Sequence, residues 1–551
     1  MSGAGAMPDG RDQRLARITG AAPQAGPGGA WATAAAVMLA LLAWHVWFIP
    51  HSGMTLFYDE AQYWDWSREP AWGYYSKPPL VAWLIGASTA VFGDSVLGVR
   101  LLIMLLYPLT ALLIGRLAED LRPGAGPVAA LVFISLPISG LLGMFATTDA
   151  PLLLTWALAA WALWRAQTTD GLRWWALLGV AAGLGVLAKY TAAAFSLTAL
   201  IALWAVPGPR RGLRRAGPWV AAAIALLLIA PNLWWNAQMG FPTLQHTADI
   251  TTRSSRGGGL GAALEFIAGQ AAILGPVGAW YALAGVRRLR SAAHAHPPAS
   301  ASLTSGRAAD QPLPAGAGAY LLALTLPLLG VAVLQAFRAS AHINWAAPAH
   351  VGSVLLAVVA LMPAGGLRRR ALAVLVGSNL ALTLLVAHLP DLARATGATL
   401  PSRLDVFVRM RGWDRAFAEL EARLPELAQP GTIVLSDDRL LLTEAAYQWR
   451  AFNVRPVAWN PEGGVRDHYE LTTRFAPLPG QPIVLLARDG EPRHVLEHFA
   501  RVQRIPPAIV RVGPDRTAEV HVFRLGGWIG PPTAYGAAEP EAAGARLAAL
   551  R

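Results

Sequence analysis

The chain has 551 residues, of which 54% are hydrophobic and only 14% are charged. A soluble domain carries about 25% charged residues, so this composition, with a mean hydropathy of +0.40, excludes an ordinary soluble protein. The formal net charge of +12 does not indicate a nucleic-acid partner, because the basic residues form short clusters between apolar runs.

Apolar runs recur along the first 390 residues. Crossing a bilayer takes about 20 apolar residues, and residues 29–49 contain no acid, Lys or Arg. The runs expected to cross are 29–49, 97–117, 126–146, 151–165, 172–188, 192–207, 218–235, 260–285, 316–336, 345–364 and 371–388. The pattern predicts a polytopic α-helical membrane protein with about 11 to 13 transmembrane helices. Residues 78–93 are expected to form a re-entrant or peripheral element, because a full crossing there would invert the charge pattern.

The basic clusters predict the orientation of the chain. They lie at 11–17, 116–122, 165–173, 210–215, 287–290 and 368–370. These clusters occupy alternate loops, which is the pattern of cytoplasmic loops. We therefore expect a cytoplasmic N-terminus and, after an odd number of crossings, a C-terminus outside the cell or in the periplasm. The expected location is a plasma membrane, in a bacterium the inner membrane.

Three segments outside the apolar runs have different compositions. Residues 1–28 are rich in Gly, Ala, Pro and Arg and are expected to be disordered in the cytoplasm. Residues 287–315 are expected to form a flexible cytoplasmic loop within the membrane domain 29–390. From residue 401 to 551 the sequence predicts a soluble α/β domain of an ordinary size on the periplasmic side.

Periodicity predicts the elements of this domain. Apolar residues spaced by four and three from Val406 to Leu424 indicate an amphipathic helix. Further elements are expected as strands at 432–436, 456–460, 482–488 and 519–525, with helices at 439–449 and near 492–501. The sequence has no Gly-rich phosphate loop here, which argues against a nucleotide site and favours a structural or acceptor-recognising domain.

The segment FYDEAQYWDWSREPAWGYYSKPPL, residues 57–80, concentrates charge and aromatic rings in the first outer loop. A single carboxylate at a membrane surface is most often solvated or caps a helix. Here Asp59 and Glu60 form an adjacent pair next to Tyr58, and Lys77 precedes two prolines that fix a turn back toward the bundle. The segment is therefore a candidate catalytic loop, although Trp and Tyr also gather at bilayer interfaces without catalysis.

The other outer loops add ionisable and polar residues. Asp149 lies in TTDAP and Lys189 in AKYTA, both at boundaries of apolar runs, where an ionisable residue is a functional hypothesis. FPTLQHT and RASAHINWAAPAH contribute His246, Arg338, His342 and Asn344. A carboxylate that removes a proton and fixed cations that stabilise a leaving phosphate suit a reaction between a lipid phosphate and a hydroxyl acceptor.

The ordered set DE, KPPL, TDAP, KYT, FPTLQHT and HINW resembles glycosyltransferase family 39. That family has the GT-C fold and includes protein O-mannosyltransferases and the aminoarabinose transferases that act on lipid A. The resemblance covers roughly residues 29–390. It implies a polyprenyl- or dolichyl-phosphate sugar donor, inversion at the anomeric carbon, and an envelope lipid, glycan or protein as hydroxyl acceptor.

The resemblance also implies roles for individual residues. Asp59 matches the catalytic base and Asp149 the second acid, while Lys77 and Lys189 would hold the donor phosphate. Glu60 would orient Asp59 or coordinate an ion. The remaining residues of the expected substrate-binding set are Tyr58, His246, Arg338, His342 and Asn344.

No cofactor is firmly implied. Lipid A aminoarabinose enzymes carry a Glu before the KPP turn, where this chain has Ser76. This departure puts in doubt both a metal site and that substrate. A divalent cation bridging Asp59, Asp149 and His246 is left open.

Two other classes are weighed against the glycosyltransferase. A transporter or flippase of a lipid-linked precursor would show internal repeats and ionisable residues near the bilayer midplane, and neither is evident. A non-catalytic envelope scaffold would tolerate Asp59→Asn without loss of function. The sequence does not identify the sugar or the acceptor.

Overall fold

The computed structural model describes residues 27–169, 171–205, 215–252, 257–294, 313–362, 365–452 and 454–529. The predicted N-terminal segment 1–28 lies almost entirely outside these residues, as does most of the predicted loop 287–315. Residues 287–294 of that loop continue a helix, so this part of the prediction is wrong.

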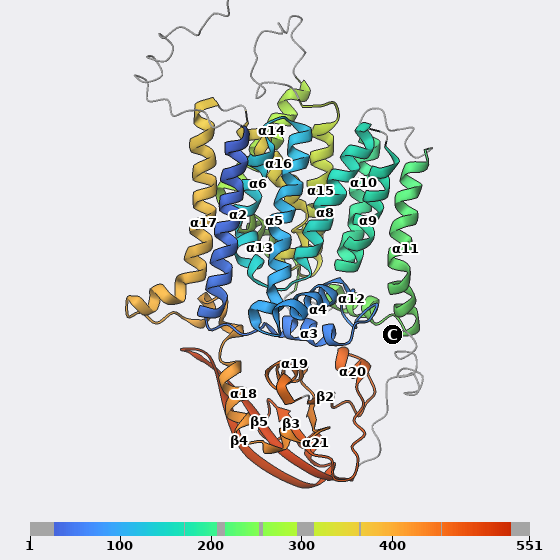
Figure 1. Ribbon diagram of the computed structural model, residues 1–551, viewed down its shortest axis with the longest axis vertical. Helices are drawn as coiled ribbons and strands as arrows, with labels where there is room; N and C mark the ends of the chain where they lie inside the picture. Colours follow the sequence, from blue (N-terminus) through green and yellow to red (C-terminus); the bar gives the residue numbers. More distant parts are fainter. Residues whose placement is uncertain are drawn as a thin grey trace, which may run out of the picture.

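The apolar runs form a bundle of helices that lie side by side (Figure 1). Its helices are α2 (Pro27–His51), α5 (Val96–Leu121), α6 (Gly126–Ser135), α7 (Pro137–Leu141), α8 (Asp149–Thr169), α9 (Leu172–Ala188), α10 (Phe195–Ala205), α11 (Ala216–Gln238), α13 (Leu260–Leu274), α14 (Pro276–His294), α15 (Ala317–Arg338), α16 (Ala349–Leu361) and α17 (Gly365–Ala395). Within the described residues, 5 helices are long and apolar enough to cross a membrane, or up to 7 if each bent pair is one span. The expected 11 to 13 crossings remain a prediction.

Two predicted crossings are broken: residues 126–146 bend by 59° between α6 and α7, and residues 260–285 bend more sharply. Residues 260–285 were expected to form a single span, but α13 and α14 meet at an angle of 101°. Gly275 at the junction has a φ of 72°, and Pro276 starts the next helix. A residue before proline is disfavoured in the helical conformation, and glycine tolerates a positive φ. The Gly-Pro pair therefore ends α13 and redirects the chain.

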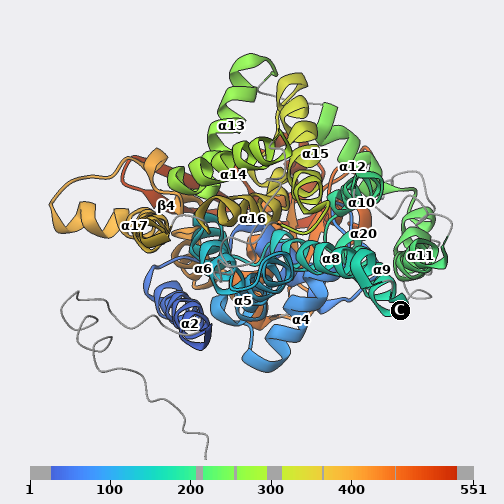
Figure 2. The ribbon, with the colours of Figure 1, turned by 90° about the horizontal axis from the view of Figure 1, so that it is seen from above.

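Two short helices cover one end of the bundle. They are α3 (Tyr58–Arg68) and α4 (Leu80–Phe92), and both lie between the bundle and the C-terminal domain (Figure 1). Viewed from above, α4 lies at the edge of the bundle beside α5 (Figure 2). This position agrees with the peripheral element expected for residues 78–93.

The C-terminal domain is built on a five-stranded sheet. Its elements are α18 (Trp413–Glu421), β1 (Ile433–Ser436), α19 (Arg439–Gln448), β2 (Arg455–Ala458), α20 (His468–Thr472), β3 (Ile483–Ala487), α21 (Arg493–Leu496), β4 (Phe499–Gly513) and β5 (Arg516–Trp528). The strand order is β2-β1-β3-β5-β4. β1 pairs in parallel with β2 and β3, whereas β5 is antiparallel to β3 and β4.

Two predictions for this domain are wrong. The helix expected near 492–501 ends at Leu496, and the strand β4 begins at Phe499. β4 is an edge strand whose register shifts between Ile505 and Ala508, so it tolerates the intervening prolines. The single helix expected over 406–424 is also interrupted, because Gly412 adopts a φ of 81° just before α18.

The domain is joined to the bundle through α3 and its neighbouring loops. The Tyr469 hydroxyl donates to Oδ2 of Asp65 at 2.9 Å, and the Tyr447 hydroxyl donates to the backbone oxygen of Asp94 at 3.0 Å. The backbone N–H of Thr55 donates to the oxygen of Met410 at 2.7 Å. These contacts place the domain directly over the predicted catalytic loop.

Candidate active site

Asp59 and Glu60, the two adjacent acids on α3, lie in different environments. Glu60 is buried and receives hydrogen bonds from Nε and Nη2 of Arg100 at 2.8 and 2.6 Å. It also accepts from the backbone N–H groups of Phe57 and Ala146 at 2.9 and 2.8 Å. The bond to Phe57 satisfies an otherwise unpaired donor at the start of the helix. Glu60 therefore anchors α3 to α5 and to the loop before α8, and its carboxylate is fully engaged away from the neighbouring acid.

Asp59 faces a different direction, because successive helical residues are rotated by about 100°. Its side chain is 38% exposed, and Oδ1 lies 3.3 Å from Nη2 of Arg439. Nη1 of Arg439 donates to Oε1 of Gln62 at 2.6 Å, and the guanidinium lies 5.1 Å from the centre of the Tyr58 ring. Arg439 belongs to α19, so the C-terminal domain supplies a cation to the predicted base.

A second group joins residues from three separate loops. Nζ of Lys189 lies 2.8 Å from Oδ1 of Asp149, with side chains 14% and 3% exposed respectively. Nδ2 of Asn344 donates to Oδ2 of the same carboxylate at 2.7 Å. Asp149 starts α8, Lys189 follows α9, and Asn344 lies in the short helix Ile343–Ala346. The TDAP, KYT and HINW motifs thus meet at one buried carboxylate.

Lys77 lies within electrostatic range of both groups. Burial lowers the pKa of Lys77, and the nearby charge of Asp59 acts in the opposite direction. Lys189 and Arg439 lower it further, while Asp149 raises it. Four charged groups surround Lys77 closely enough to act on it, and three of them were predicted from the sequence. We call these five residues the charged cluster: Asp59, Lys77, Asp149, Lys189 and Arg439.

His246 lies at the edge of the charged cluster. It is on α12 (Pro242–Thr252), and its ring centre lies 5.2 Å from that of Tyr75. Burial, reinforced by Lys77 and Arg439, lowers the pKa of His246 to about 4. The imidazole is therefore neutral near pH 7 and can exchange hydrogen bonds with a substrate without adding a positive charge.

Arg338 and His342, both predicted to bind substrate, lie apart from the charged cluster. The side chain of Arg338 is exposed at the end of α15, and within the described part of the chain no ion pair joins it to the cluster. His342 is also exposed, with its ring centre 5.6 Å from that of Trp345. Of the HINW segment, Asn344 is the residue that contacts the buried acid.

The residues suggested for a divalent cation do not fit one. In the described ranges, no group of three or more His, Asp or Glu side chains is arranged to hold a metal. Asp149 contacts Lys189 and Asn344, and Asp59 faces Arg439. Lys189 and Arg439 therefore already supply a positive charge to each of the two carboxylates.

Sequence reasoning missed two residues of the site. Arg439 follows β1 and the sequence Ser436-Asp437-Asp438, at the carboxyl end of a parallel strand, where α/β domains place ligand-binding residues. That rule could have identified the loop but not its partner in the bundle. Burial on α3 raises the pKa of Tyr63, and the nearby charges of Asp59 and Asp149 raise it further. Nothing in the local sequence distinguishes Tyr63 from the other rings.

Comparisons with known proteins identify the relatives of this chain. A profile of the dolichyl-phosphate-mannose-protein mannosyltransferase family matches residues 76–235. The lipid A galacturonosyltransferase RgtD of Rhizobium johnstonii is 30% identical over 444 residues, which cover 79% of this chain and 86% of the relative. An undecaprenyl phosphate-α-4-amino-4-deoxy-L-arabinose arabinosyl transferase of Serratia proteamaculans is 31% identical over 224 residues, or 37% of this chain and 39% of the relative.

Solved structures share the fold. Apo ArnT from Cupriavidus metallidurans superposes with a TM-score of 0.60 at 16% identity, covering 90% of this chain and 98% of that one. The same protein bound to undecaprenyl phosphate gives a TM-score of 0.57 at 16% identity, covering 90% of this chain and 99% of that one. The predicted fold class and the predicted glycosyltransferase activity are confirmed. The chain belongs to the dolichyl-phosphate-mannose-protein mannosyltransferase family and is a multi-pass membrane glycosyltransferase of the GT-C fold.

Proposed function

We propose that the chain transfers a sugar from a polyprenyl-phosphate donor to a hydroxyl group of lipid A or a related envelope lipid. The observation that carries this proposal is the charged cluster, in which Lys189 pairs with the buried Asp149 at 2.8 Å and Lys77 lies within electrostatic range of both Asp59 and Asp149. The name of one relative gives lipid A, which supports this acceptor. The name of another gives an undecaprenyl-phosphate sugar, which supports this class of donor.

In this proposal, Lys77 and Lys189 bind the phosphate of the donor. Lys189 is held by the buried carboxylate of Asp149, which is itself oriented by Asn344. A lysine supplies a compact positive charge, and fixed charges at a leaving phosphate stabilise the transition state without reorganisation. Asp149 is then a positioning residue that sets the place of the Lys189 ammonium.

Asp59 is proposed as the general base. Its carboxylate takes the proton of the acceptor hydroxyl while the acceptor oxygen bonds to the anomeric carbon of the sugar. The bond between that carbon and the phosphate oxygen breaks, and polyprenyl phosphate leaves with the electron pair. Attack opposite the leaving group inverts the anomeric configuration. Glu60 takes no part in this step; it holds α3, and so Asp59, in position.

The proposed orientation puts the charged cluster and the C-terminal domain on the periplasmic face of the inner membrane. The alternating Arg clusters support a cytoplasmic N-terminus. The clusters at 116–122 and 165–173 belong to the ends of α5 and α8 opposite Asp149. A lipid-linked donor and an envelope lipid acceptor would then meet on the same face.

The charged cluster also argues against a transporter. Transporters bind their substrates near the bilayer midplane between repeats. Here the charged residues gather around α3, which lies across the end of the bundle (Figure 1). Binding at this end suits a reaction at the membrane surface.

The test is transfer by purified enzyme in proteoliposomes. Radiolabelled undecaprenyl-phosphate galacturonic acid, aminoarabinose and mannose are each offered with lipid A, with and without EDTA. We expect one donor to label the lipid and EDTA to leave the rate unchanged. Movement of labelled donor between leaflets without labelling of any acceptor would contradict the proposal and favour a flippase.

A further inference from the structure

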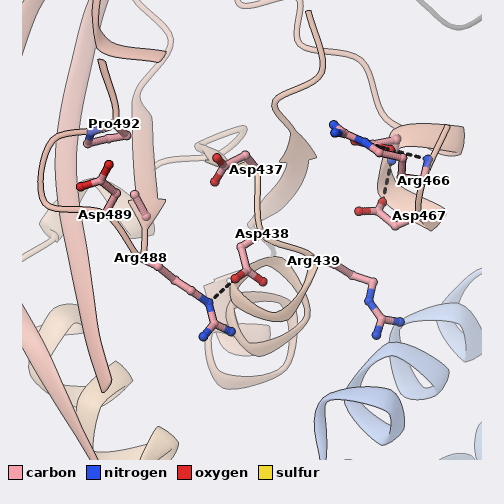
Figure 3. Close-up of a pocket in the computed structure, with 10 residues that line it drawn as sticks. Asp437, Asp438, Arg439, Arg466, Asp467, Arg488, Asp489 and Pro492 are labelled. Carbon is pink, nitrogen blue, oxygen red and sulfur yellow. Dashed lines mark hydrogen bonds and ion pairs between the residues drawn. The ribbon is translucent and has the colours of Figure 1, made fainter. Parts of the chain in front are cut away.

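An open pocket lies in the C-terminal domain on the side facing the charged cluster. Its volume is about 530 Å³, which is within the range of about 300–1,000 Å³ found for small-ligand sites. Figure 3 shows its walls: one carries Asp437 and Asp438, another Arg488 and Asp489, and a third includes Asp467.

The topology of the sheet explains where this pocket forms. β1 lies between β2 and β3, and both neighbours are parallel to it. After β1 the chain passes to β2 on one side, and it reaches β3, on the other side of β1, only later. The connections that follow β1 and β3 therefore lead to opposite sides of the sheet. Open α/β sheets bind ligands in the crevice at such a reversal, beyond the carboxyl ends of the strands. Asp437 follows β1 and Arg488 follows β3, so both line this crevice.

The side chains of the pocket select one kind of ligand. Five carboxylates and three guanidinium groups line it, which leaves a formal charge of −2, and the other lining residues are Ala487 and Pro492. So few apolar groups argue against an acyl or isoprenoid chain. The excess of carboxylates disfavours a phosphate. Hydroxyl groups suit the pocket, because they donate to carboxylates and accept from guanidinium groups.

Several carboxylate oxygens in the pocket still have room to accept hydrogen bonds. Asp467 accepts the backbone N–H of Glu470 with Oδ1 at 2.9 Å, and Asp489 accepts that of Glu491 with Oδ1 at 3.0 Å. Oδ2 of Asp437 lies 2.9 Å from Nε2 of His494, within hydrogen-bond distance. Each carboxylate can accept about four hydrogen bonds in total, so these side chains are held in place and still have oxygens available.

Arg439 links this pocket to the proposed catalytic base. It lines the pocket, and its side chain points away from the pocket centre toward the pale blue helices of the bundle (Figure 3). There its guanidinium lies 3.3 Å from the Asp59 carboxylate. Arg439 therefore both lines the pocket and contacts the proposed base.

We propose that this pocket, which we call the switch-point pocket, binds a hydroxyl-bearing sugar of the acceptor and directs the hydroxyl group of that acceptor toward Asp59. The occupant is an uncharged or amine-bearing sugar. This inference rests on the proposed function for its role in transfer, whereas the binding of sugar can be measured without any reaction.

The first test measures binding to the full-length enzyme in nanodiscs by saturation-transfer NMR. The probes are a β-1,6-linked glucosamine disaccharide, its bisphosphate, and inorganic phosphate. We expect the unphosphorylated disaccharide to bind, and the double variant Asp437→Asn/Asp489→Asn to bind it about tenfold more weakly because hydrogen bonds to charged acceptors are lost. The matched control is Glu421→Gln, an exposed carboxylate on α18, which should bind like the wild type. Stronger binding of either phosphate probe, or equal binding by the double variant, would overturn the inference.

The second test separates the switch-point pocket from the transfer reaction. With lipid A as acceptor and donor in excess, the double variant should raise the acceptor KM about tenfold and leave the donor KM unchanged. If wild type binds the disaccharide but transfers no sugar, the proposed function fails and the sugar site stands. If transfer proceeds with an unchanged acceptor KM in the double variant, the pocket inference fails and the proposed function stands.

Discussion

The guanidinium of Arg439 and the carboxylate of Asp59 are 380 residues apart in the sequence and 3.3 Å apart in the structure. One belongs to α19 of the C-terminal domain and the other to α3 at the end of the bundle. Their contact makes the domain part of the proposed active site. It also gives the domain a direct means of influencing the residue that we propose as the base.

The first prediction concerns Arg439→Ala. Removing the guanidinium frees Asp59 and Gln62 from their shared partner, so kcat/KM for transfer should fall about tenfold, equivalent to about 1.4 kcal/mol. Arg439→Lys should restore only part of the rate, because lysine keeps the charge but lacks the planar fork that reaches two partners and stacks on Tyr58. Steady-state kinetics in proteoliposomes measure both.

The control for this prediction is Arg415→Ala, which removes an exposed cation from α18. It should leave kcat/KM unchanged. If Arg439→Ala behaved like this control, the domain would have no role in the chemistry of Asp59.

The second prediction distinguishes Glu60 from its neighbour. Glu60→Gln leaves Arg100 buried with an incomplete ion pair, which should destabilise the fold by about 3–5 kcal/mol. Adding Arg100→Met should recover part of the loss, because the unpaired charge is then gone. Thermal unfolding in detergent measures the coupling between the two positions. Equal stability of Glu60→Gln and wild type, together with loss of activity, would instead assign Glu60 to the chemistry.

The third prediction concerns Lys189, whose ammonium contacts Asp149 at 2.8 Å. Lys189→Ala should raise the donor KM about tenfold and leave the acceptor KM unchanged, because the lost charge serves the donor phosphate. Arg116→Ala, which removes an exposed cation from α5, is the matched control and should change neither constant. An effect of Lys189→Ala on the acceptor KM alone would contradict the assignment.

The fourth prediction is a pH dependence. Burial lowers the pKa of Lys77, so its ammonium loses its proton at a lower pH than an ordinary lysine. A charge that binds phosphate is present below this pKa and absent above it, so kcat/KM for the donor should fall on the alkaline side. Lys77→Arg should move that fall to higher pH, since arginine stays protonated. An alkaline limb that is the same in both proteins would rule out Lys77 as its source.

The sequence predicts the helices well where a long uninterrupted apolar run is enough to identify them. Residues 29–49 and 97–117 correspond to α2 and α5 because a span needs a long apolar run. The sequence prediction fails where a helix-breaking pair interrupts an apolar run, as Gly275 and Pro276 do between α13 and α14. β4 was missed because its prolines argue against a strand, and only its place at the sheet edge permits them.

The structure brings some of the predicted site residues together and leaves others apart, in each case for a physical reason. Asp149, Lys189 and Asn344 each lie at the end of an apolar run, and the ends of these runs meet at one end of the bundle. Arg439 could not be predicted, because no local pattern says which loop of the domain meets which loop of the bundle. Glu60 was grouped with Asp59 by adjacency, whereas the helical rotation between them separates their environments.

The measurement that tests the central claim most directly is sugar transfer by Asp59→Asn, compared with Asp65→Asn on the same helix. Asp65 bonds Tyr469 at the domain interface and lies outside the proposed chemistry. We predict that Asp59→Asn folds normally and loses about 10²–10⁴-fold in kcat, the contribution of a general base, while Asp65→Asn keeps most of its activity. Equal rates for Asp59→Asn and wild type would contradict the account, because the proposed base would then be dispensable.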